Sequence, residues 1–243
     1  MILLKAVEYR DGDTTLEGIL GSDDGVSGKR PGVLVIHDWW GVGPYVEKRV
    51  EQLATLGYVA LAADIYGKRV RPATMGEAAE FANHYKANRS LLRSRAYAGL
   101  KALKDNASVN IKSIAAIGYC FGGTAVLELA RSGADVAGFV SFHGGLETPT
   151  PDDAKNIRGK VLVLHGADDP IVPSPEVLAF QDEMRKAHVD WQMIIYGGAV
   201  HSFTNPGAGH EPSTGAAYNE KADKRSWQAM KTFFQEVFEN IGK

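Results

Sequence analysis

One cysteine stands in a glycine-rich segment whose spacing is typical of a nucleophile held on a sharp turn. Residues 118–123 read GYCFGG, follow a β-rich run and precede a helical pattern. Glycines beside the nucleophile let a strand and a helix approach closely, because they carry no Cβ atom. At a helix N-terminus the dipole favours a Cys120 thiolate, and the backbone N–H of Phe121 would face a developing oxyanion. The segment therefore predicts a cysteine nucleophile.

Two other interpretations of the same segment are a buried structural cysteine and a phosphate-binding turn. The phosphate interpretation is disfavoured because no Gly-Lys-Ser/Thr follows. The loop at residues 41–43 does not restore it, since Val46 stands where a dinucleotide motif needs glycine or alanine. The choice between nucleophile and packing residue depends on the rest of the chain.

An acid and a histidine follow the cysteine, each just after a further β-rich run. Asp168 and Asp169 follow residues 161–164, and His201 follows residues 191–196. The carboxyl ends of parallel strands share one edge of a sheet, so these residues can meet there. The order nucleophile, acid, histidine is that of an α/β-hydrolase triad, in which His201 moves the protons and the acid orients it. On position alone, either aspartate fits.

The elements that must position these residues alternate along the chain. β-rich runs at 33–36, 58–63, 111–117, 136–142, 161–164 and 191–196 are separated by helical patterns. A final helix is expected from about residue 216, with one apolar stripe formed by Trp227, Met230, Phe234, Val237 and Ile241. Residues 5–10 and 14–20 predict an antiparallel hairpin. We therefore expect an α/β-hydrolase fold, a mainly parallel twisted sheet with helices on both faces, in a single domain over residues 1–243.

Composition excludes several classes of function. The 27 Lys and Arg residues nearly balance the 29 Asp and Glu residues, so no charge excess predicts binding to nucleic acid or an anionic membrane. One cysteine can form neither an intramolecular disulfide nor a cysteine-based zinc site. The first residues lack the apolar stretch of a secretory signal, and no apolar run is long enough for a membrane helix. We expect a cytoplasmic protein, and composition predicts no particular oligomeric state.

These motifs together resemble those of the dienelactone hydrolase family of α/β-hydrolases over nearly the whole chain. The resemblance rests on residues 37–41 (HDWWG), residues 118–123, residues 166–173 (GADDPIVP) and residues 201–203 (HSF). It implies that Cys120 is the nucleophile, that His201 is the base, and that the acid is Asp169 rather than Asp168.

The resemblance also implies roles for the loop after the first buried run. The second oxyanion donor would be the backbone N–H of Trp39. The family commonly has a glutamate hydrogen-bonded to the resting thiol at the position of Asp38, so the shorter Asp38 is expected to take that role. Dienelactone hydrolases proper bind a substrate carboxylate with arginines, one of them shortly after H-S-F. Asn205 stands there in this chain, and a neutral amide cannot supply a charged clamp.

We therefore expect the substrate to be a neutral ester or lactone rather than dienelactone itself. Arg69, Arg71 and Arg89 are possible replacements for the missing arginine, although basic loop residues are more often solvated. Three aromatic residues on loops at the active edge are expected to line an apolar substrate pocket, namely Trp39, Trp40 and Phe203.

The leading hypothesis is a cysteine-dependent hydrolase of carboxylic esters or lactones that forms an acyl-thioester and needs no cofactor or metal. His37, His143 and His165 also end β-rich runs, but no zinc motif accompanies them, and we expect them to hydrogen-bond loop backbone. One alternative is metal-independent hydrolysis of activated organophosphate triesters by the same triad. Another is a non-catalytic binding protein of α/β-hydrolase fold.

Overall fold

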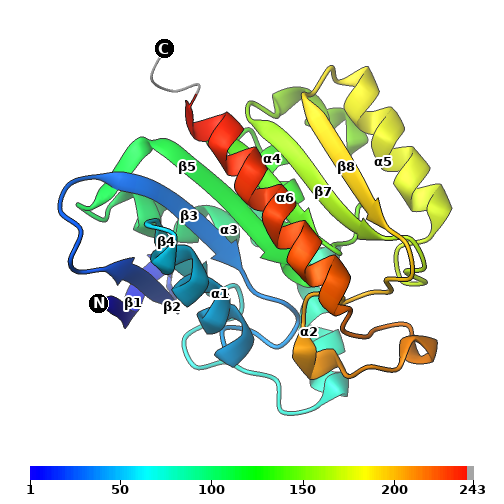
Figure 1. Cartoon of the computed structure of the whole chain (residues 1–243), viewed down its shortest axis with the longest axis horizontal. Helices are drawn as coiled ribbons and strands as arrows, with labels where there is room; N and C mark the ends of the chain where they lie inside the picture. The colour runs from blue at the N-terminus through cyan, green and yellow to red at the C-terminus, as the bar shows by residue number, and fades with distance from the viewer. Residues whose placement is uncertain (240–243) are drawn as a thin grey trace.

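Eight strands form one sheet in the computed structural model, which describes residues 1–239 (Figure 1). Their order is β1-β2-β4-β3-β5-β6-β7-β8. The bounds are β1 Ile2–Asp11, β2 Thr14–Asp23, β3 Arg30–Ile36, β4 Val59–Ala63, β5 Val109–Tyr119, β6 Gly138–Phe142, β7 Lys160–Gly166 and β8 Trp191–Tyr196. The predicted hairpin is β1–β2, and β2 is also antiparallel to β4, whereas every other neighbouring pair is parallel. The predicted α/β-hydrolase fold is confirmed.

Helices cover both faces of the sheet (Figure 1). The bounds are α1 Pro44–Thr55, α2 Met75–Ala87, α3 Arg89–Lys104, α4 Phe121–Arg131, α5 Ser174–Lys186 and α6 Glu220–Glu239, with short 3-10 helices at Pro151–Asn156, Pro206–Ala208 and Pro212–Thr214. Apolar residues of α1 and α6 pack on one face, and those of α2 to α5 pack on the other. Of the helices in residues 1–239, none has the length and apolar character needed to cross a membrane.

The last helix begins later than predicted. It starts at Glu220 rather than near residue 216, because the preceding segment pairs with the loop that follows β8. The N–H of Ala217 donates to the carbonyl of His201, and the N–H of Asn219 donates to that of Phe203. Ile241, the last residue of the predicted stripe, lies outside the described residues.

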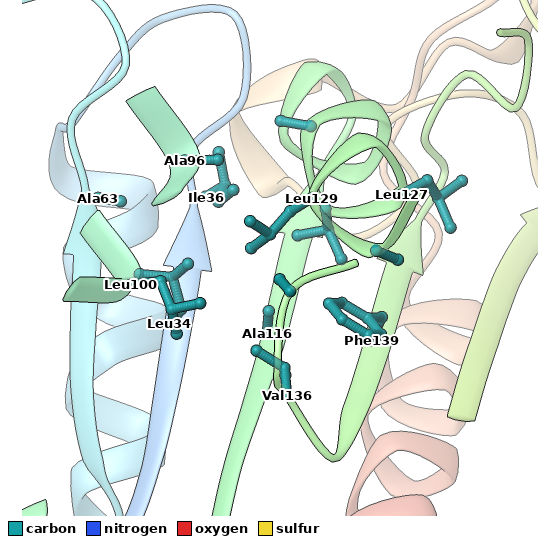
Figure 2. Close-up of a cluster of buried hydrophobic side chains, with 14 of the residues drawn as sticks. Leu34, Ile36, Ala63, Ala96, Leu100, Ala116, Leu127, Leu129, Val136 and Phe139 are labelled. Atoms are coloured by element: carbon teal, nitrogen blue, oxygen red, sulfur yellow. The ribbon is translucent and has the colours of Figure 1, made fainter. Parts of the chain in front are cut away.

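The fully buried helix α4 gives the cysteine turn a rigid support. Every residue of α4 from Phe121 to Arg131 is buried. Figure 2 shows Leu129 of this helix above the sheet near Ala116 of β5, while Leu100 of α3 lies against Leu34 of β3. Side chains in such close-packed cores have little freedom to move. The start of α4 is therefore fixed relative to the strand ends beside it.

Candidate active site

Cys120 lies on a strained turn between β5 and α4. Its φ of 54° and ψ of −116° are uncommon for a residue with a side chain. The turn is tight: a Cβ atom on Gly118 would lie 2.0 Å from the Gly122 carbonyl oxygen, and one on Gly122 would lie 2.2 Å from that of Ile36. The glycines are thus required by close backbone approach, as the sequence predicts.

The structure brings three of the predicted residues into hydrogen-bonding distance. Nε2 of His201 lies 3.0 Å from Sγ of Cys120, and Nδ1 of His201 lies 2.8 Å from Oδ2 of Asp169. The side chains of Asp169 and His201 are 0% and 6% exposed, so water competes little for these bonds. Asp168 is exposed and lies outside the group. The acid beside the histidine is therefore Asp169.

Two further hydrogen bonds fix the Asp169 carboxylate. Its Oδ1 accepts the N–H groups of Ile171 and Val172 at 2.9 and 3.2 Å, which leaves Oδ2 for His201. Burial by itself lowers the pKa of His201, but the charge of a Cys120 thiolate and the bond to Asp169 raise that pKa to about 10. The charged imidazolium form of His201 is therefore favoured in this arrangement.

Residues that sequence reasoning missed anchor the loop carrying His201. The carbonyl of Thr204 accepts from Arg49 Nη2 at 2.6 Å, and its hydroxyl lies 2.6 Å from both the Tyr45 hydroxyl and Nε2 of His143. Burial, aided by the charge of His201, lowers the pKa of His143 well below its usual value, so His143 is neutral. No local spacing signals this network, because Arg49 and Thr204 are 155 residues apart.

The loop after β3 lies beside the histidine loop and touches it through Asp38 and Asn205. Oδ1 of Asp38 accepts the N–H of Trp40 at 2.9 Å, and the Tyr66 hydroxyl donates to the carbonyl of Trp39 at 3.1 Å. Within residues 1–239, neither the N–H of Trp39 nor that of Phe121 has a hydrogen-bond acceptor. Both groups are free to donate to a substrate oxygen.

The position of Asp38 differs from the prediction. Its second oxygen accepts from Asn205 Nδ2 at 3.3 Å, and the sulfur of Cys120 is bonded to His201. Within residues 1–239, no hydrogen bond joins Asp38 to the sulfur of Cys120, so Asp38 does not hold the thiol in this structure. Burial raises the pKa of Asp38 to about 6, although the Trp40 N–H and the Asn205 amide act in the opposite direction.

A cavity of about 290 Å³ opens beside the sulfur. Its apolar wall includes Trp39, Ala79, Ala82, Phe121 and Ile171, of which the two alanines on α2 were not predicted. The polar part of the wall contains two basic and two acidic side chains, namely Lys86, Arg89, Glu147 and Glu176. Of the three arginines considered from the sequence, Arg89 alone is among the lining residues.

Two of the three predicted pocket aromatics do not line the cavity. Phe203 is fully buried, with its ring centre 5.0 Å from that of His143 and 5.5 Å from that of Tyr196. The chain turns at Ser202, whose φ is 57°, and Phe203 joins the core. Trp40 is 37% exposed and packs on Trp39 from outside. The prediction is wrong for Phe203 and Trp40, whereas Trp39 does line the cavity.

The other strand-end histidines have separate surroundings. Nε2 of His37 accepts the N–H of Ile65 at 3.2 Å, so its Nδ1 carries the proton and donates to the carbonyl of Asp38. Burial lowers the pKa of His37 to about 4. His143 bonds to a side chain rather than to backbone, and Nδ1 of His165 has no partner within residues 1–239. In the same range, no three His, Cys, Asp or Glu side chains are grouped to hold a metal ion.

A mostly parallel eight-stranded sheet with a sharp cysteine-bearing turn between β5 and α4 is typical of an α/β-hydrolase. The model of the dienelactone hydrolase family matches residues 16–238, and the chain belongs to that family. It is accordingly a hydrolase that acts on esters or lactones. Membership in a hydrolase family removes the alternative of a non-catalytic binding protein.

Individual relatives agree with this family. A structure described as m3DLH is 42% identical, covers 98% of this chain and 99% of its own, and superposes with a TM-score of 0.94. A dienelactone hydrolase-like promiscuous phosphotriesterase from metagenomic libraries has the same identity and coverage with a TM-score of 0.92. An uncharacterized protein of Caenorhabditis elegans is 39% identical over 153 residues, which are 60% of this chain and 94% of the relative.

Proposed function

We propose that this protein is a cysteine-dependent hydrolase of neutral carboxylic esters or lactones that acts through an acyl-thioester. The observation that carries the proposal is the placement of His201 between Cys120 and Asp169, at 3.0 and 2.8 Å. Hydrogen bonding between nucleophile and base, with the base oriented by a third group, is the arrangement that activates a nucleophile.

The reaction follows from these contacts. The Cys120 thiolate attacks the substrate carbonyl carbon, and the N–H groups of Trp39 and Phe121 stabilise the oxyanion that forms. The His201 imidazolium donates its proton to the leaving alkoxide, which leaves an acyl-thioester and a neutral imidazole. His201 then takes a proton from water, the resulting hydroxide attacks the thioester, and collapse releases the acid and restores the thiolate–imidazolium pair.

The charges around the cavity support a neutral substrate. Lys86 and Arg89 are balanced by Glu147 and Glu176, so the wall has no excess of positive charge to attract a carboxylate. The amide of Asn205 donates to Asp38, and Asn205 is not among the residues that line the cavity.

The test is turnover of p-nitrophenyl acetate and of a neutral lactone by the wild type and by Cys120→Ala. We expect Cys120→Ala to lose at least about 10³-fold in kcat, since removal of a triad member leaves only binding and the oxyanion donors. Acid quenching during turnover should trap the acyl group on the peptide that contains Cys120, seen by mass spectrometry. Undiminished turnover by Cys120→Ala would refute the proposal.

Activated organophosphate triesters are a second candidate substrate class. The observation favouring them is the 42% identity to a promiscuous phosphotriesterase. The thiolate would attack phosphorus and the aryloxide would leave with a proton from His201, while the same N–H groups stabilise the phosphoryl oxygen. Water deprotonated by His201 would then attack phosphorus, break the S–P bond and release the phosphodiester, with no metal required. Comparing kcat/KM for p-nitrophenyl acetate and diethyl p-nitrophenyl phosphate distinguishes the two, because the leaving group is the same.

A further inference from the structure

Asn205 joins the histidine loop to the loop that follows β3. It lies four residues after His201, and its Nδ2 donates to Oδ2 of Asp38 at 3.3 Å. Its Oδ1 accepts the N–H of Gly207 at 2.8 Å. Because a backbone N–H can only donate, this second bond fixes the amide orientation and directs the NH₂ group at Asp38.

Asp38 connects the contact with Asn205 to the backbone N–H of Trp39, which would donate to the substrate. Its other oxygen accepts the N–H of Trp40, which closes a turn around Trp39, and the free N–H of Trp39 is set by that turn. Asp38 is only 7% exposed, so solvent has little access to these bonds. A buried carboxylate is costly to retain unless donors satisfy it, and here two donors do so.

The sheet itself does not fix the distance between the two loops. The Asp38 loop follows β3 and the Asn205 loop follows β8, and β5, β6 and β7 lie between these strands. The two residues are also 167 positions apart in the chain. A side-chain bond between the loops therefore supplies a direct constraint that no strand pairing provides.

We propose that the Asp38–Asn205 pair is a positioning bridge that holds the Trp39 oxyanion donor in register with His201. The inference rests on the proposed function, since it assigns the Trp39 N–H to the oxyanion. The bridge affects the transition state rather than substrate binding. Without it the substrate can still bind, but the Trp39 N–H and His201 are no longer both in position to contact the tetrahedral intermediate. A misplacement of about 1 Å at a reacting centre can cost about 10²-fold in rate.

Exchanging the two side chains tests the bridge. In Asp38→Asn two amide groups face each other, and in Asn205→Asp two carboxylates do. In the double variant Asp38→Asn/Asn205→Asp, the amide at 38 donates to the carboxylate at 205. Its oxygen still accepts the Trp40 N–H, and the carboxylate still accepts the Gly207 N–H. All three hydrogen bonds are thus restored with donor and acceptor reversed.

We expect each single variant to lose about 10- to 100-fold in kcat for p-nitrophenyl acetate, with KM changed less than about threefold, as for an interaction made in the transition state. The double variant should recover to within about fivefold of the wild type, whereas independent structural effects would multiply. Thermal unfolding of all four proteins confirms that each one folds. A double variant no faster than the slower single, or singles with wild-type kcat, would overturn the bridge.

Two parallel measurements separate this inference from the proposed function. Alkylation of Cys120 by iodoacetamide should proceed at the wild-type rate in all three variants, because the contact between Cys120 and His201 is untouched. A fall in alkylation parallel to kcat would mean that Asp38 and Asn205 act on the sulfur, which contradicts the bridge. Turnover by Cys120→Ala refutes the proposed function, whereas an inactive Cys120→Ala with a failed exchange refutes the bridge alone.

Discussion

Replacing Asp169 by asparagine changes a single atom in the group of three. Oδ1 of the new side chain can still accept the N–H groups of Ile171 and Val172, so the loop should keep its conformation. Oδ2, which lies 2.8 Å from Nδ1 of His201, becomes an NH₂ group and can no longer accept. His201 must then present its lone pair at Nδ1 and its proton at Nε2, where it cannot take a proton from the thiol or from water.

The expected magnitude follows from burial of this contact. In the forms that react, His201 carries a proton at Nδ1, and in the variant this N–H faces the NH₂ group. The lost hydrogen bond to a charged group then costs about 1.5–3 kcal/mol, and the unsatisfied buried donor costs about 1–3 kcal/mol more. With the Asp169 side chain fully buried, both effects apply in full, which gives about 10²- to 10⁴-fold in kcat. The assay is steady-state hydrolysis of p-nitrophenyl acetate at pH 7, with thermal unfolding measured in parallel.

The neighbouring aspartate is the matched control for this variant. Asp168 is exposed and outside the group of three, so Asp168→Asn should stay within about threefold of wild-type kcat, as for a typical surface change. If Asp169→Asn keeps more than a tenth of the activity, or if Asp168→Asn loses as much, the assigned role of Asp169 is refuted.

Three further predictions concern the turn, the core and the buried carboxyl. Gly122→Ala places a Cβ atom 2.2 Å from the Ile36 carbonyl oxygen, and it should lower the free energy of unfolding in urea by about 1–3 kcal/mol. An unchanged unfolding midpoint would contradict the close approach. Phe203→Ala should cost about 3–5 kcal/mol in the same assay because the ring is fully buried, and a change below about 1 kcal/mol would instead favour a pocket position. Burial raises the pKa of Asp38 from 3.8 to about 6. The protonated Asp38 carboxyl therefore contributes to the free energy of unfolding fully below pH 3.8, and this contribution is lost as the pH rises through 6. Asp38→Asn should remove this fall, roughly 2 kcal/mol in unfolding free energy between pH 4 and pH 7, and an identical pH slope in both proteins would disprove it.

The parts of the site that could be predicted depend on local sequence or on a shared sheet edge. The turn at Cys120 is local, because glycines within three residues decide whether strand and helix can approach. The meeting of Cys120, Asp169 and His201 needs only parallel strands whose ends coincide. Neither inference requires the direction of a side chain on a loop.

The wrong predictions about the site required such a direction. Phe203 points into the core because the backbone at Ser202 has a positive φ, which a run of the letters H-S-F does not reveal. Asp38 turns toward Asn205, a partner 167 residues away, and no periodicity joins the two. The start of α6 shifted for a similar reason, since the preceding residues bond to a distant loop.

Because Arg49 of α1 anchors Thr204, turnover depends on the packing of α1 and α6 on their face of the sheet. Arg49 also bonds to Asp223 of α6 at 2.7 Å, and its guanidinium carbon lies 5.4 Å from the ring centre of Trp227. The contact between α1 and α6 therefore helps to position the loop that carries His201. A denaturant concentration that unfolds only α1 and α6 would abolish activity, while most of the helical circular dichroism signal would remain. Loss of activity would therefore precede global unfolding when this face of the protein is destabilised.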